Sequence, residues 1–172
     1  MRIAISCLLL PALALTACKK VEDEGETEAA AEMADPVGSY DIDPESGEIR
    51  ATHTDAAGVT TTMRAGETVE ARFPEPFTAY PGMTITNTTS VARGEGAFVT
   101  VEFTSPDPRA NIVDFYRAQA ELAGINPDVE VEGGETTTLG GENAGEELSF
   151  ALQVTRVRGR TEGQLSVARG LD

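Results

Sequence analysis

Alternating hydrophobic and polar positions run through most of the chain beyond residue 47 and predict β-strands. EIRATHT, the turn DAAG and VTTTMR indicate a first hairpin over residues 48–64. TITNTTSVAR, the turn GEG and AFVTVEFT indicate a second hairpin over residues 84–104. Further strands are predicted in DVEVE, TTTLG, ELSFALQVTRV and TEGQLSVAR.

A helical pattern is clearest in SPDPRANIVDFYRAQAELAG, residues 105–124. Its apolar stripe is predicted to consist of Ile112, Phe115, Gln119 and Leu122, widened by Val113, Tyr116 and Ala123. Ser105 or Asp107 is expected to cap the start of the helix, with a proline at the first helical position in either case. Gly124 predicts a left-handed stop, and Ile125 follows where a Schellman motif makes its apolar contact.

Together these elements predict an α+β fold, a twisted antiparallel sheet of five to seven strands with one main helix packed on one face. Residues 39–172 supply enough chain for one such domain. No second core is needed to accommodate the predicted strands and helix.

The amino-terminal part has a different composition. Residues 1–17 combine Arg2 with a short apolar run and a small-residue exit, which is typical of a removable export signal. Residues 18–38 are rich in acidic side chains and contain no Phe, Tyr, Trp, Ile or Leu, which predicts a disordered tether.

The residues Leu15, Thr16, Ala17 and Cys18 resemble the lipobox of bacterial lipoproteins. The resemblance implies signal cleavage between Ala17 and Cys18, a lipid on the Cys18 sulfur and attachment to the membrane through that lipid. Lys19 follows where an Asp would imply retention at the inner membrane, so the resemblance favours the outer membrane, with the domain facing the periplasm.

A second resemblance covers about 45 residues, from YPG at residue 80 through the predicted helix. This stretch is similar to uncharacterised Gram-negative envelope lipoproteins. It supports the strand–helix–strand order and implies no catalytic residues.

The net charge of the chain, its cysteines and its one histidine exclude several classes of function. Lys plus Arg number 13 against 29 Asp plus Glu, a net charge of −16, so nucleic acid is not expected as a partner. Neither Cys7 nor Cys18 lies in residues 39–172, which excludes thiol chemistry there, and no cofactor is expected. The one histidine, His53, is expected to be a half-buried strand residue rather than a catalyst or ligand.

Two groups of residues are candidate sites. Arg156, Arg158 and Arg160 alternate in TRVRGR and would share one strand face if no bulge intervened, which would form an anion or partner contact. Pairing with glutamates of a neighbouring strand is the alternative. Asp41, Asp43 and Glu45 are weak candidates for a metal site. Ser46 stands where a calcium loop of the EF-hand type has glycine, so a turn into the first hairpin is favoured.

These features favour a non-enzymatic, lipid-anchored envelope protein that binds another envelope component through a sheet edge or the outer side of its helix. The alternative is a periplasmic protein that binds a small ligand or a divalent cation with its acidic loops. A hydrolase with paired carboxylates is a third class, for which the sequence singles out no pair.

Overall fold

The computed structural model describes residues 38–171, so the predicted export signal, the cleavage and lipid site at Ala17 and Cys18 and nearly all of the tether lie outside the described residues. Within that range, nine strands form one antiparallel sheet in the order β1-β2-β3-β4-β5-β9-β8-β7-β6. The strands are β1 (Gly38–Ile42), β2 (Ile49–Thr54), β3 (Thr60–Gly66), β4 (Thr84–Arg93), β5 (Gly96–Ser105), β6 (Val129–Gly133), β7 (Thr136–Asn143), β8 (Leu148–Val157) and β9 (Arg160–Arg169). The helix α1 spans Arg109–Leu122, and a short 3-10 helix spans Ala144–Glu146.

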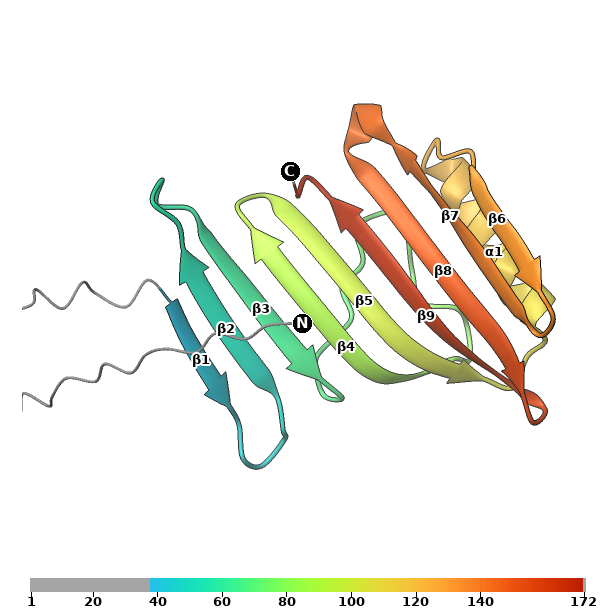
Figure 1. The fold of residues 1–172 in the computed structure, drawn as a ribbon, viewed down its shortest axis with the longest axis horizontal. Coiled ribbons are helices and arrows are strands. Elements are labelled where there is room, and N and C mark those ends of the chain that lie inside the picture. The colour runs from blue at the N-terminus through green and yellow to red at the C-terminus, as the bar shows by residue number, and fades with distance from the viewer. Residues whose placement is uncertain (1–37, 172) are drawn as a thin grey trace, which may run out of the picture. The chain divides into compact units, whose positions relative to one another are not determined.

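The sheet is built from two meanders that meet in its middle (Figure 1). Strands β1 to β5 follow one another, α1 comes next, and β6 to β9 return so that β9 pairs with β5. The Thr100 and Ser166 hydroxyls are 2.8 Å apart across this junction. Both predicted hairpins and all four later strands are confirmed, as is the position of the helix.

The predicted count of five to seven strands is wrong, because the sheet has nine. The strand β1 was not predicted, since GSYDI directly follows an acidic segment and contains only two large apolar side chains, Tyr40 and Ile42. The joining of the two meanders was not predicted either, because the pairing of β5 with β9 connects segments far apart in the chain. Local alternation predicts strands but does not specify such distant partners.

One face of the sheet, here called the covered face, carries the hydrophobic core. The helix α1 packs against β7 and β8 on this face, and the segment 67–83 between β3 and β4 lies on the same side. Figure 1 views the other side, the open face, with α1 behind β6 and β7. The core strand residues are Val99, Val101, Phe103, Leu139, Leu148, Phe150, Leu152, Val154, Leu165 and Val167.

Specific contacts hold the segment 67–83 to the core. Phe77 packs on Phe150 with 5.2 Å between ring centroids. The Gln119 amide bonds Thr78 twice: its oxygen accepts from the Thr78 backbone N–H at 3.1 Å, and its nitrogen donates to the Thr78 hydroxyl at 2.7 Å. The buried Tyr116 hydroxyl accepts from the Tyr80 backbone N–H at 3.1 Å, and burial raises the Tyr116 pKa far above its usual range.

The carboxyl end of α1 forms the predicted Schellman motif. Gly124 has φ +68°, the Ile125 N–H donates to the Ala120 carbonyl at 2.8 Å, and Ile125 is buried. Leu122, however, is 79% exposed, so its placement in the buried stripe is wrong. It lies about a third of a turn from the middle of the buried stripe, around Tyr116, and therefore points to solvent.

The predicted side-chain cap at the start of α1 is also wrong. The N-cap residue is Pro108, which has no side chain able to accept a hydrogen bond. The Asp107 carboxylate instead accepts from the Tyr80 hydroxyl at 2.6 Å, and Ser105 is buried at the end of β5. Both candidate caps therefore serve contacts outside the helix.

Candidate binding surface

The open face is the side of the sheet that carries neither α1 nor the segment 67–83, and its chemistry changes along the strand order. On β5, Phe98 and Thr100 point to the open face because Val99 and Val101 between them lie in the core. Residues directly opposite in neighbouring strands share a face, so the strand register identifies the rest of the surface.

The middle of the open face of β1 to β5 is apolar. One cross-strand row runs from Phe98 through Val91, Met63 and Ala51 to Tyr40. The next row runs from Thr100 through Thr89, Ala65 and Ile49 to Ile42. We call the apolar members of these rows the apolar patch, which consists of Tyr40, Ile42, Ile49, Ala51, Met63, Ala65, Val91 and Phe98.

The apolar patch is exposed at its edge, and its other six members are half-buried. At its edge, Tyr40 is 64% exposed and Ile42 52% exposed. A hollow of about 340 Å³ adjoins the patch where Ile49 and Ala65 meet Asn87. Neither row contains a charged side chain, although the chain has a net charge of −16.

The reverse side of the same strands is polar and charged. On the covered face, the row behind the patch runs from Ser90 through Arg64 and Arg50 to Asp41. Glu48, only 5% exposed, accepts hydrogen bonds from Arg50 Nε at 2.8 Å and from Arg64 Nε at 2.7 Å. These hydrogen bonds lower the Glu48 pKa to about 2 and tie the β1–β2 loop to β3, which supports the patch from behind.

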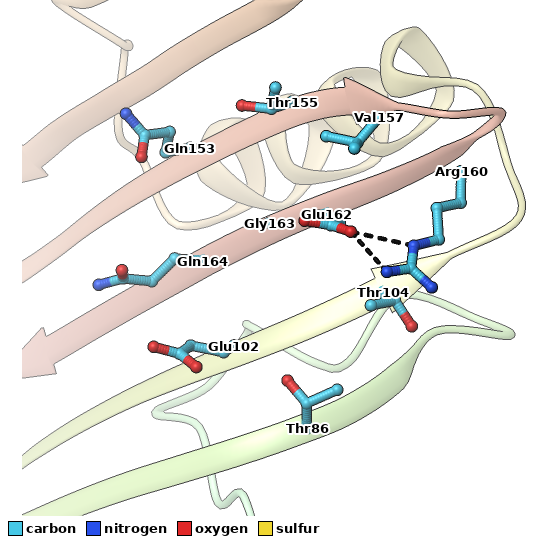
Figure 2. A pocket seen from close by; sticks show the side chains of 10 residues that line it. All are labelled: Thr86, Glu102, Thr104, Gln153, Thr155, Val157, Arg160, Glu162, Gly163 and Gln164. Carbon is cyan, nitrogen blue, oxygen red and sulfur yellow. Dashed lines mark hydrogen bonds and ion pairs between the residues drawn. The ribbon is translucent and has the colours of Figure 1, made fainter.

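A shallow groove of about 540 Å³ lies on the open face of β4, β5, β8 and β9, and we call it the polar groove (Figure 2). Its lining consists of Thr86, Glu102, Thr104, Gln153, Thr155, Val157, Arg160, Glu162, Gly163 and Gln164. Glycine is needed at Gly163, because a Cβ atom there would come within 2.5 Å of Phe103 in the core below.

The groove presents mostly neutral hydrogen-bonding groups. Gln164 lies opposite Gln153 on β8 and Glu102 on β5, and its amide nitrogen donates to the Thr100 hydroxyl at 3.3 Å. The Arg160 guanidinium pairs with Glu162 at 2.7 Å, as drawn in Figure 2. Amides and hydroxyls arranged in this way can bind a neutral polar ligand.

The three arginines of TRVRGR do not share a strand face, so that part of the prediction is wrong. Arg158 (φ +47°) and Gly159 (φ +88°) form the two-residue turn between β8 and β9. Arg156 donates to the Asp107 carbonyl at 2.7 Å and to the Gly159 carbonyl at 2.6 Å, which ties this turn to the start of α1. Arg160 is bonded to Glu162 of its own strand rather than to a glutamate of a neighbouring strand, and contact of these arginines with an anion or partner stays a prediction.

The acidic candidates Asp41, Asp43 and Glu45 lie in β1 and the β1–β2 loop. The Asp43 carboxylate accepts from the Ser46 and Glu45 backbone N–H groups, and these bonds lower its pKa. This is the turn that the sequence favoured. Across residues 38–171, no group of three or more His, Cys, Asp or Glu side chains is arranged to hold a metal ion.

His53 lies on the open face of β2 and is exposed rather than half-buried. It stands at the rim of the sheet opposite Thr61 and Gly38, beyond the apolar patch. Its exposure follows from the position of β2 next to the short edge strand β1.

Sequence reasoning missed both the apolar patch and the polar groove. The alternation in the first hairpin already placed Ile49, Ala51 and Met63 on one side of their strands. Alternation alone does not say on which side of the sheet the helix packs. Only the strand register that joins β3, β4 and β5 shows that these residues lie on the face opposite the helix.

Comparison of the chain with protein-family models, with curated proteins and with solved structures gave no match. In the part of the chain that the structure describes, no helix is both long enough and apolar enough to cross a bilayer. The geometry of the open face is therefore the basis for a functional proposal.

Proposed function

We propose that this chain is a lipid-anchored, non-enzymatic envelope protein that binds a macromolecular partner through the apolar patch. In this proposal, lipid on Cys18 holds the chain to the outer membrane, and residues 19–37 link the anchor to the sheet. The partner covers the open face of β1 to β5. This replaces the sheet edge or outer helix side expected from sequence.

The observation that carries the proposal is an accessible apolar surface in a strongly acidic chain. Interface cores are depleted in charged residues, as the two rows of the patch are. Large contiguous apolar surfaces on soluble domains commonly mark interaction sites. The covered face of the same strands bears Glu48, Arg50 and Arg64, so the apolar character is confined to one side.

Binding at the patch is tested with a photo-crosslinking amino acid placed at Met63, on the open face of β3. The matched control is the same group at Thr62, the preceding residue, which points to the opposite side. We expect adducts from position 63 and only background from position 62. Equal adduct patterns from the two positions would contradict the proposal.

The lipid anchor is tested separately with Cys18→Ser. We expect the parent chain to fractionate with the membrane and to carry an acyl mass, and the variant to lose both. A variant that still sediments with membranes, together with a parent that carries no acyl mass, would remove the anchor from the proposal while leaving the patch unaffected.

A second candidate function is the binding of a small neutral ligand in the polar groove. The observation that favours it is the opposed pair Gln153 and Gln164 beside Glu102. A thermal-shift screen with neutral sugars and with calcium, using the parent chain and Gln164→Ala, tests it. A shift with a sugar that Gln164→Ala abolishes would support the groove, and no shift at millimolar ligand would count against it.

A further inference from the structure

We infer that the partner at the apolar patch is a second copy of this chain, packed patch to patch; this rests on the proposed function of the patch. The contact would be a two-fold sheet-on-sheet interface. The absence of charge in the patch supports a second copy, and the size of the patch and the direction of its strands are compatible with a weak contact between copies on one membrane.

Charge makes the patch complementary to itself. Two copies of an acidic chain repel each other wherever carboxylates of one copy face carboxylates of the other. The rows from Phe98 to Tyr40 and from Thr100 to Ile42, however, contain no charged side chain. In a two-fold contact each patch meets the same patch, so apolar groups face apolar groups and no charge is buried. An anionic or cationic partner would find no complementary charge in these rows.

Size indicates a weak contact. At about 4.8 Å between strands and about 6.6 Å between alternate residues of a strand, the five strands and two rows of the patch cover roughly 300 Å² per copy, or roughly 600 Å² in total. Stable interfaces usually bury about 1,200–2,000 Å², so this contact belongs with weak encounters. Attachment of both copies to one membrane would raise their effective concentration and favour it.

Strand direction makes the contact compatible with a shared membrane. Packed sheets align their strands within about 30° of each other. A two-fold axis that lies between the sheets and parallel to the strands leaves strand direction unchanged. The starts of β1, at Gly38, then lie at the same end of both copies. Nineteen residues lie between Cys18 and Gly38, and this stretch reaches at most roughly 70 Å, so both lipids could enter one bilayer.

The test uses single cysteines in the full chain in membranes. Ala51→Cys places a thiol in the patch on β2, next to the central strand β3, and Thr52→Cys places one on the opposite side of β2. After mild oxidation we expect at least five times more disulfide-linked dimer from Ala51→Cys than from Thr52→Cys. The parent chain sets the background from Cys7 and Cys18.

The outcomes separate this inference from the proposed function. No excess of homodimer from Ala51→Cys overturns the second copy. If the Ala51→Cys thiol is then still protected from a maleimide relative to Thr52→Cys, another partner covers the patch and the proposed function stands. If both thiols react equally fast, the proposed function fails as well. An environment-sensitive dye at position 51 that shifts in lipid vesicles containing single copies would place lipid on the patch and also overturn the inference.

A second readout does not depend on disulfides. Two differently tagged full chains are co-expressed and one tag is captured from solubilised membranes. We expect Met63→Glu in both copies to lower recovery of the second tag at least five-fold, and Thr62→Glu to lower it less than two-fold. Unchanged recovery with Met63→Glu would overturn the inference.

Discussion

The two ends of the sheet place their apolar residues on opposite sides. On the covered face of β5 and β7 to β9 the apolar side chains pack against α1 and the segment 67–83, and the polar groove lies on the open face of this region. In β1 to β3 the apolar side chains lie on the open face, and the covered face holds the Glu48 cluster with Arg50 and Arg64. The first arrangement builds a core within the chain, and the second leaves an apolar surface for a contact outside it.

The largest difference is expected when an apolar side chain is truncated in each region. Leu152→Ala, at 1% exposure in the core, should lower the free energy of unfolding by about 2–5 kcal/mol. Met63→Ala, on the open face, should lower it by less than about 1 kcal/mol. Urea unfolding monitored by circular dichroism measures both. Equal losses would mean that the patch belongs to a core.

Backbone crowding gives the next largest effect. Gly163→Ala would place a Cβ atom 2.5 Å from Phe103 and 2.8 Å from Val154, so we expect a loss of about 1–3 kcal/mol. Gly133→Ala is the matched control, because no atom lies within 4 Å of a Cβ at that position. Urea midpoints should separate the two variants. A stable Gly163→Ala would contradict the close packing beneath the polar groove.

The clamp between α1 and the segment 67–83 is a smaller test of the covered face. Gln119→Leu keeps the apolar volume but removes both bonds to Thr78, and should cost about 1–2 kcal/mol. Amide hydrogen exchange in the variant should be faster than in the parent chain within residues 67–83, with little change in β1 and β2. Uniform acceleration along the chain would contradict a local clamp.

Acid should weaken the first meander through Glu48. Its pKa is lowered to about 2 in the folded state, from an ordinary value near 4.5, so its contribution to stability is present above pH 4.5 and is lost as pH falls towards 2. Glu48→Gln should be less stable than the parent at neutral pH and should lose this acid dependence, as measured by thermal unfolding. Glu70→Gln removes a carboxylate from the exposed pair with Arg72 and should change stability by less than about 0.5 kcal/mol at neutral pH.

The smallest effect on stability is expected at Tyr40. Because this side chain is 64% exposed, Tyr40→Ser should change the free energy of unfolding by less than about 0.5 kcal/mol. The same change should lower the yield of the Ala51→Cys dimer, since both residues lie in one row of the patch. Reduced stability with an unchanged dimer yield would mean that Tyr40 contributes to folding and not to the contact between copies.

The sequence predicted the local elements well because their signals are local. Alternation identified eight of the strands, and Gly124 with Ile125 identified how α1 ends. β1 was not predicted because its pattern is weak, and one sheet that holds all nine strands was not predicted because the junction of β5 with β9 depends on distant pairing.

The candidate site was less predictable. Arg156 was expected on a surface, but it hydrogen-bonds the carbonyl of Asp107, a residue 49 positions away. The apolar patch was not predicted, because the alternation in β2 and β3 is the same as in any half-buried hairpin. Whether the apolar side of this hairpin lies in the core or on the open face depends on the side of the sheet against which α1 packs. The sequence of the first meander contains no local pattern that indicates this side.

The junction of β5 with β9 also sets the order in which the fold can be completed. Synthesis proceeds from the amino end, so β9 is the last of the nine strands to emerge. Until then β5 has no partner on one side, and the core of the second meander cannot close over its full width. Closure must bring together segments more than 60 residues apart, which makes folding slow compared with helical domains of similar size.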